Sequence, residues 1–157
     1  MSIEINNESG VEVQEEELVR IIKHILAAMH LHPQTEVSVI LADVPTMEKL
    51  HIEWMDEPGP TDVLSFPMDE LRPGTATHPT AAGLLGDIVL CPAVAAEQAE
   101  AAGHGTGEEL LLLTTHGMLH LMGYDHAEPD EKEEMFGIQR ELLSSFLGKE
   151  APRETMK

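Results

Sequence analysis

Residues 106–126 read TGEELLLLTTHGMLHLMGYDH and predict the helix around which the rest of the chain packs. The run of four leucines makes the segment apolar on nearly every side, which is typical of a helix that passes through a core. Thr106 and Glu109 have the spacing of a capping box, and Gly123 can take the left-handed conformation that ends a helix. We therefore expect a central helix over residues 107–122.

The flanking segments alternate between strand and helix patterns. Strands are expected around 3–5 and at 36–43, 62–66 and 84–90, and further helices at 18–29, from 45, at 92–102 and from 129. The inner faces of the second and last of these helices would carry Met47, Leu50 and Trp54, and Met135, Ile138, Leu142 and Phe146. This order, without an internal repeat, predicts one α+β domain over residues 1–157 with a sheet of about four strands backed by helices. Residues 71–83 are expected to be an exposed loop, and residues 148–157 a frayed tail.

The composition excludes several classes of protein. The chain has 157 residues and a formal net charge of −20, and it is 42% hydrophobic, which is too apolar for a disordered acidic tail. No apolar run approaches the ~20 residues of a membrane helix, and the N-terminus lacks the pattern of a secretory signal. Cys91 is the only cysteine, which fits a reducing cytoplasm. We expect a cytoplasmic protein, and on composition alone such acidity disfavours nucleic acid as a partner.

Three histidines carry the strongest chemical signal. His116 and His120 lie four residues apart, so a helix presents both imidazoles on one face. Gly123 can turn the chain back so that His126 reaches the same point. Two histidines on an apolar helix would more simply be core residues, but three at this spacing favour a metal site. We predict one zinc ion per chain, with a zinc-bound water in the open fourth position that is typical of catalytic sites.

Metzincin peptidases share the spacing H-x-x-x-H-x-x-G-x-x-H. Those enzymes need a glutamate directly after the first histidine, because that carboxylate is the general base. This chain has Gly117 there, which offers no side chain. A zinc peptidase-like hydrolase is therefore the weaker alternative.

The segment THGMLHLMGYDH resembles the signature of the YbeY family of bacterial metal-dependent, single-strand endoribonucleases. The N-terminal strand–helix, PTDVLSFP at 60–67 and LGDIV at 85–89 agree in the same order, so the likeness covers residues 1–147 outside the loop at 71–83. The resemblance implies a cytoplasmic zinc hydrolase that matures the 3′ end of 16S ribosomal RNA and takes part in quality control of the 70S ribosome. It also implies the zinc ligands His116, His120 and His126.

One position departs from the family pattern. Family members commonly carry an arginine a few residues before the Thr-Asp-Val-Leu-Ser-Phe strand, and the aligned residue here is Met55. A guanidinium at that place could hold a phosphate, whereas a thioether cannot. Arg72 is the nearest basic candidate in sequence for this task. Otherwise the activity is weak or depends on a partner.

No general base adjoins the histidines in sequence, and Asp62 and Asp87 are the candidates. Asp125 and Asp87 could instead orient an imidazole through its free N–H. The simpler alternatives are a loop-capping role for Asp125 and a strand-end role for Asp87. The candidates for the substrate groove are Thr61, Ser65, Arg72 and Tyr124, for which turn, strand-edge or core roles are the alternatives.

The charge and the resemblance together predict an RNA substrate that is delivered by a partner. With Met55 in place of a cation, affinity for free RNA should be poor and strongly lowered by salt. The expected partners are single-stranded ribosomal RNA and the small ribosomal subunit or a basic ribosomal protein, and neither DNA nor a membrane is expected. A non-catalytic ribosome-assembly factor with a zinc site is the remaining alternative, against which an open fourth coordination position argues.

Overall fold

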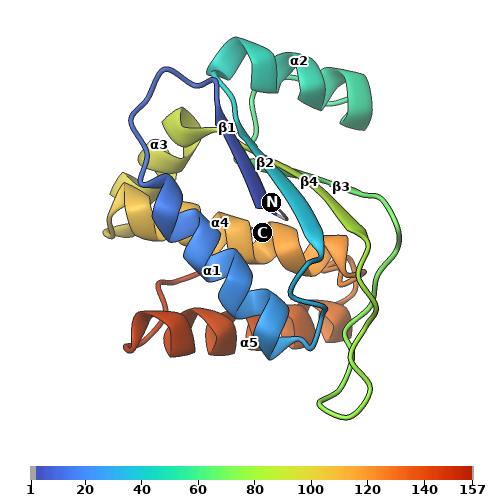
Figure 1. Cartoon of the computed structure of the whole chain (residues 1–157). Helices are drawn as coiled ribbons and strands as arrows, with labels where there is room; N and C mark the ends of the chain where they lie inside the picture. Colours follow the sequence, from blue (N-terminus) through green and yellow to red (C-terminus); the bar gives the residue numbers. More distant parts are fainter. Residues whose placement is uncertain (1–2, 157) are drawn as a thin grey trace.

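The structure, a computed structural model, describes residues 3–156. Its strands are β1 (Ile3–Asn7), β2 (Glu36–Leu41), β3 (Val63–Pro67) and β4 (Leu84–Leu90) (Figure 1). Its helices are α1 (Glu15–Ala28), α2 (Val44–Met55), α3 (Pro92–Ala102), α4 (Thr106–Leu121) and α5 (Pro129–Leu147). The predicted α+β domain with a four-stranded sheet is confirmed. In the described part of the chain, no helix combines the length and the apolar character needed to cross a bilayer.

The sheet is mixed, with the strand order β1-β2-β4-β3. β1 and β4 lie parallel to β2, and β3 lies antiparallel to β4. Parallel neighbours need a crossover, which α1 provides between β1 and β2. In β2 the buried side chains are Val37, Val39 and Leu41, and this alternation places one face of the sheet against the helices.

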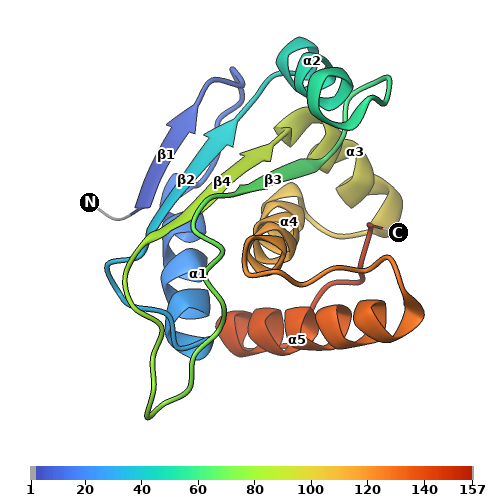
Figure 2. The same ribbon diagram turned by 90° about the vertical axis from the view of Figure 1, so that its right-hand side faces the viewer.

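Helix α4 lies between the sheet and α5 (Figure 2). Every residue from Glu109 to Leu119 is buried, which confirms the prediction of a helix through the core. Its last residues therefore have fixed surroundings: β3 and β4 on one side and α5 on the other. Side chains that project from this end of α4 are positioned by the core itself.

The capping box predicted at the start of α4 is absent. Gly105 is the N-cap residue and makes no side-chain bond, while the Glu109 side chain points into the protein. Its carboxylate accepts hydrogen bonds from Gln98 and from Thr155, and it pairs with His104. A buried carboxylate is costly without partners, and these partners satisfy it better than one exposed backbone N–H would.

Helix α2 covers only one end of the sheet, and this changes its predicted inner face. Met47 is buried as expected, but Trp54 is 61% exposed. The indole packs edge-on against Phe66 on β3, with 5.7 Å between ring centroids. The three-residue apolar pattern was too short to show where the helix leaves the sheet.

Residues 149–156 are packed against the domain, in contrast to the frayed tail expected from the sequence. The backbone N–H of Ala151 donates to Ser144 Oγ at 3.2 Å, and Thr155 Oγ1 donates to the carboxylate of Glu109. Two ion pairs also hold this segment, Lys149–Glu108 and Arg140–Glu154. The tail therefore runs back from the end of α5 toward α3 and α4 (Figure 2).

The segment at 71–83 forms no helix and adds no strand to the sheet. It projects as a long arm below the β3–β4 end of the sheet (Figure 1). The base of the arm is fixed to the end of α1, because Gly74 and Thr80 donate their N–H groups to the carbonyls of Met29 and His30 at 3.0 and 2.9 Å.

Candidate metal centre

The three predicted histidines meet at the C-terminal end of α4. His116 and His120 project from successive turns of that helix. Gly123, with φ of +100°, takes the left-handed conformation that reverses the chain and brings His126 beside them. One ring nitrogen from each of the three lies within 4.8 Å of the other two. The ring centroids are 4.6 to 5.2 Å apart.

In two of these rings, Nδ1, the nitrogen that points away from the cluster, makes a hydrogen bond. His120 Nδ1 lies 2.9 Å from the backbone oxygen of Tyr124, which can only accept, so Nδ1 carries the proton and Nε2 is bare. His116 Nδ1 lies 2.9 Å from the amide oxygen of Gln139, with the same consequence. The two Nε2 atoms face one another at 3.1 Å. Two lone pairs at that distance repel each other unless a cation lies against them, so the donor set fits a metal ion.

Burial keeps the imidazoles of His116 and His120 neutral. Loss of solvent, followed by the neighbouring His120, lowers the pKa of His116 to about 3, and the hydrogen bond to Gln139 only partly opposes this. Burial and then His126 also lower the pKa of His120. The neutral imidazole is the form that binds a metal, so two of the three histidines are in that form at physiological pH.

The histidines open into a cavity of about 320 Å³ between α4 and β3. Its other walls come from β3, the end of α2 and the tail: Met55, Asp62, Val63, Leu64, Ser65, Pro67 and Met156. Of the predicted residues, Asp62 and Ser65 therefore join the histidines. So does Met55, the position where the sequence departs from the family pattern.

Asp62 is held firmly in this cavity. Its Oδ1 accepts from the backbone N–H of Val63 at 2.7 Å and from Thr61 Oγ1 at 3.3 Å. Its Oδ2 accepts from Gln98 Nε2 at 3.2 Å. Ser65 Oγ lies 3.4 Å from the backbone oxygen of Gly117 on α4. Thr61, a predicted groove residue, contacts the carboxylate of Asp62 but does not itself line the cavity.

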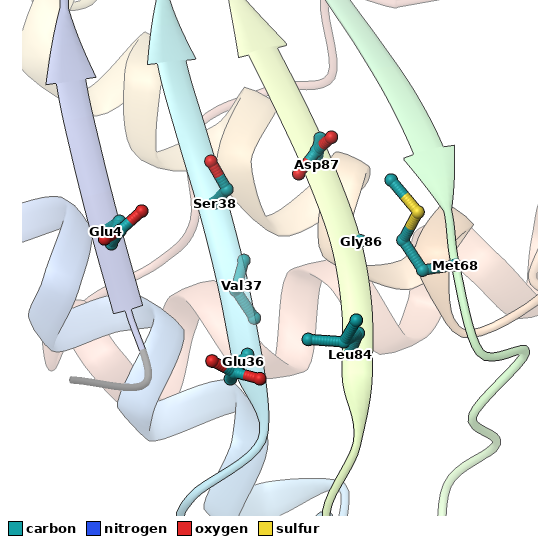
Figure 3. Close-up of a pocket in the computed structure, with 8 residues that line it drawn as sticks. All are labelled: Glu4, Glu36, Val37, Ser38, Met68, Leu84, Gly86 and Asp87. Carbon is teal, nitrogen blue, oxygen red and sulfur yellow. The ribbon is translucent and has the colours of Figure 1, made fainter.

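Asp87 lies on the other face of the sheet (Figure 3). Its neighbour Ile88 packs against α4 near Gly117, and successive side chains of a strand point to opposite faces. Asp87 accordingly lines a separate hollow with Glu4, Glu36 and Ser38. The structure thus separates Asp87 from the histidines, against both roles predicted for it, general base and imidazole partner.

The remaining candidates, Asp125, Arg72 and Tyr124, do not line the cavity of the histidines. Asp125 accepts from the backbone N–H of His126 at 2.7 Å, which is the loop-capping alternative. Arg72 and Tyr124 line a neighbouring hollow with Asp125. A Cβ on Gly123 would lie 2.8 Å from Cζ of Arg72, so the guanidinium covers the turn. Tyr124 is partly buried against the core, and burial raises the pKa of its hydroxyl.

Residues 3–147 match the family model described as endoribonuclease YbeY. The chain belongs to the YbeY family. A Renibacterium salmoninarum protein named endoribonuclease YbeY is 69% identical over 155 residues, which cover 99% of each chain. A protein of that name from Paenarthrobacter aurescens is 66% identical over 157 residues, the whole of both chains. The resemblance inferred from sequence is confirmed.

A solved structure has a similar fold. The solution structure of a protein from Thermotoga maritima matches with a TM-score of 0.63 and 27% identity, and the match covers 93% of this chain and 89% of that chain. The fold described above is therefore shared with a structure that has been solved.

Several residues near the histidines were missed from sequence, and three of them are close to His116 or reach the cavity from a distant segment. Gln139 contacts His116, and the ring of Phe136 lies 6.0 Å from that of His116. Met156 reaches the cavity from the tail. Gln139 had a signal, because it lies four residues after Met135 on the predicted inner face of α5, where a polar side chain needs a partner. Met156 had none, and it lies beyond residue 147, where the YbeY family match ends.

Proposed function

We propose that this chain is a zinc-dependent, single-strand-specific endoribonuclease that acts in the cytoplasm on the 3′ end of 16S ribosomal RNA and in quality control of 70S ribosomes. The observation that carries the proposal is the set of three imidazoles within 4.8 Å, in a chain whose relatives are named endoribonucleases. His116, His120 and His126 would hold one zinc ion. When bound, the ion would act as a Lewis acid toward water and a phosphoryl oxygen.

Asp62 is the general base in this proposal. It is the only carboxylate among the residues that line the cavity. Its bonds to Val63 and Gln98 fix its orientation, and a carboxylate oxygen has lone pairs to spare for another donor. Asp62 would accept the proton of the attacking water at one of these oxygens.

The cavity wall supplies no cation to hold the RNA backbone. None of its lining residues is lysine or arginine, and Met55 stands where the family resemblance implies an arginine. The whole chain carries a net charge of −20, which repels phosphates. We therefore propose that the substrate is presented by the small ribosomal subunit or a basic ribosomal protein.

Replacing Met55 with arginine is expected to tighten binding of free single-stranded RNA about 5- to 10-fold. The slope of log affinity against log salt concentration should become steeper by about one, because one added phosphate contact releases about one counterion. Met68→Arg is the matched control: Met68 is also exposed, at 51%, but it lies at the hollow beside Asp87. Affinity should be measured by fluorescence anisotropy at several salt concentrations. Equal gains in the two variants would show that position 55 does not face the RNA.

The substrate class is tested with one RNA sequence in three forms: single-stranded, annealed to its complement, and as the corresponding DNA. We expect cleavage of the single-stranded RNA only, abolished by a chelator and restored by zinc. A panel of peptides serves as the competing substrate. Peptide cleavage without RNA cleavage would show that the protein is a peptidase. Association with small ribosomal subunits without any cleavage would show that it is a non-catalytic assembly factor.

A further inference from the structure

The side chain of Gln139 joins the histidine cluster to the C-terminal tail. It projects from α5 and is fully buried. Its Oε1 accepts from His116 Nδ1 at 2.9 Å, and its Nε2 lies 3.7 Å from Sδ of Met156. The same amide therefore touches a predicted metal ligand on one side and the tail on the other.

The orientation of this amide determines which nitrogen of His116 is bare. With the amide oxygen toward the ring, Nδ1 carries the proton and Nε2 faces His120 as a lone pair. With the amide turned over, its NH₂ group would donate to Nδ1, and the ring proton would lie on Nε2, where it blocks metal binding. His120 has no such freedom, because its partner is a backbone carbonyl.

The tail supplies the contact that distinguishes the two orientations. A thioether sulfur is an acceptor and never a donor, so Sδ of Met156 attracts the NH₂ end of Gln139 and leaves the oxygen for His116. Met156 is itself held in place, because Thr155 donates to the buried carboxylate of Glu109 and Glu154 pairs with Arg140.

We propose that Gln139 is a positioning residue and that Met156 orients it, so that the C-terminal tail selects the metal-binding tautomer of His116. This inference rests on the proposed metal site and adds a determinant outside the residues that match the family model, which end at 147. Partners that hold the second nitrogen of a metal-binding histidine commonly change metal affinity about 10- to 100-fold when they are removed.

The proposal is tested in the full-length protein with Gln139→Leu, Gln139→Glu and Met156→Leu. Two-bond ¹H–¹⁵N correlation spectra report the tautomer of His116 in metal-free protein that also carries His120→Ala, so that no second bare nitrogen faces Nε2 of His116. Competition with a chromophoric chelator, in protein that retains His120, gives the zinc Kd. Gln139→Leu should lose the single Nδ1–H tautomer and weaken zinc binding about 10- to 100-fold. Gln139→Glu should keep the Nδ1–H tautomer of His116 and a zinc Kd within about threefold of the native value, because a carboxylate accepts in either orientation.

Met156→Leu keeps the bulk of the side chain and removes the acceptor. We expect a mixture of His116 tautomers and about 3- to 10-fold weaker zinc binding. When Met156→Leu is added to a protein that already carries Gln139→Glu, neither the tautomer nor the zinc Kd should change further. Met29→Leu, at the end of α1, controls for loss of a thioether elsewhere. Native tautomer and affinity in Met156→Leu would overturn the role of the tail, and native behaviour in Gln139→Leu would overturn the role of Gln139.

The tautomer measurement needs neither metal nor RNA, so it separates this inference from the proposed function. If protein with His120→Ala shows one Nδ1–H tautomer of His116 that Met156→Leu disturbs, and the native protein binds no zinc, the relay through Gln139 stands and the proposed function fails. If zinc binds natively and none of the variants alters the tautomer or the Kd, the relay fails and the proposed function stands.

Discussion

Replacement of His116 by alanine is expected to remove the bound zinc and to lower RNA cleavage by at least about 100-fold, because two remaining imidazoles cannot form the three-ligand site of a catalytic zinc. His116 is the most buried of the three, and its ring lies 4.6 and 5.0 Å from those of His120 and His126. Elemental analysis gives the zinc content, and the initial rate on single-stranded RNA gives the activity.

His78→Ala is the matched control for this substitution. His78 is exposed in the arm at 71–83, where its Nδ1 lies 3.1 Å from the hydroxyl oxygen of Thr77. We expect native zinc content and native cleavage in that variant. RNA cleavage that survives His116→Ala undiminished, in protein shown to lack zinc, would mean that the histidine cluster is not the active site.

Gly117→Glu is expected to destabilise the fold by on the order of 4 kcal/mol or more. A Cβ at this position would lie 3.1 Å from Cγ2 of Ile88 and 3.2 Å from Oγ of Ser65, so α4 packs here with almost no space against β3 and β4. A glutamate would both force the helix from the sheet and bury a carboxylate without a partner. Urea unfolding measures the loss.

Gly117→Ala separates the two causes, because its single methyl group tests the contact without the charge. Alanine gains up to about 1 kcal/mol of helix propensity, which the tight contact offsets, so we expect a change of about 1 kcal/mol or less. These substitutions also bear on the peptidase alternative, since metzincins carry glutamate at this position. A stable Gly117→Glu protein that hydrolyses peptides would contradict the packing described here and revive that alternative.

Local sequence signals predicted most of the architecture and the meeting of the three histidines. The strand at Leu84–Leu90 and the helix at Pro92–Ala102 were predicted with the bounds observed, because Pro92 and Gly103 mark the ends of the helix. The three histidines could be brought together from sequence because they lie on one helix and one turn, where spacing alone fixes their relative positions.

Features that depend on distant segments could not be predicted in this way. Strand periodicity shows that Asp87 differs in direction from Ile88, but which face meets α4 depends on the packing of the whole sheet. Glu109 has the sequence context of a cap, yet partners 11 and 46 residues away draw it inward. Met156 has no periodic context, so its place in the cavity follows only from the path of the tail.

The most direct test of the central claim, that one zinc ion held by three histidines is required for RNA cleavage, is a titration of the metal-free protein with zinc while the rate of single-stranded RNA cleavage is followed. We predict negligible cleavage without metal and a linear rise that stops at one zinc ion per chain. Full cleavage by the metal-free protein, or a rate that does not respond to zinc, would contradict the claim.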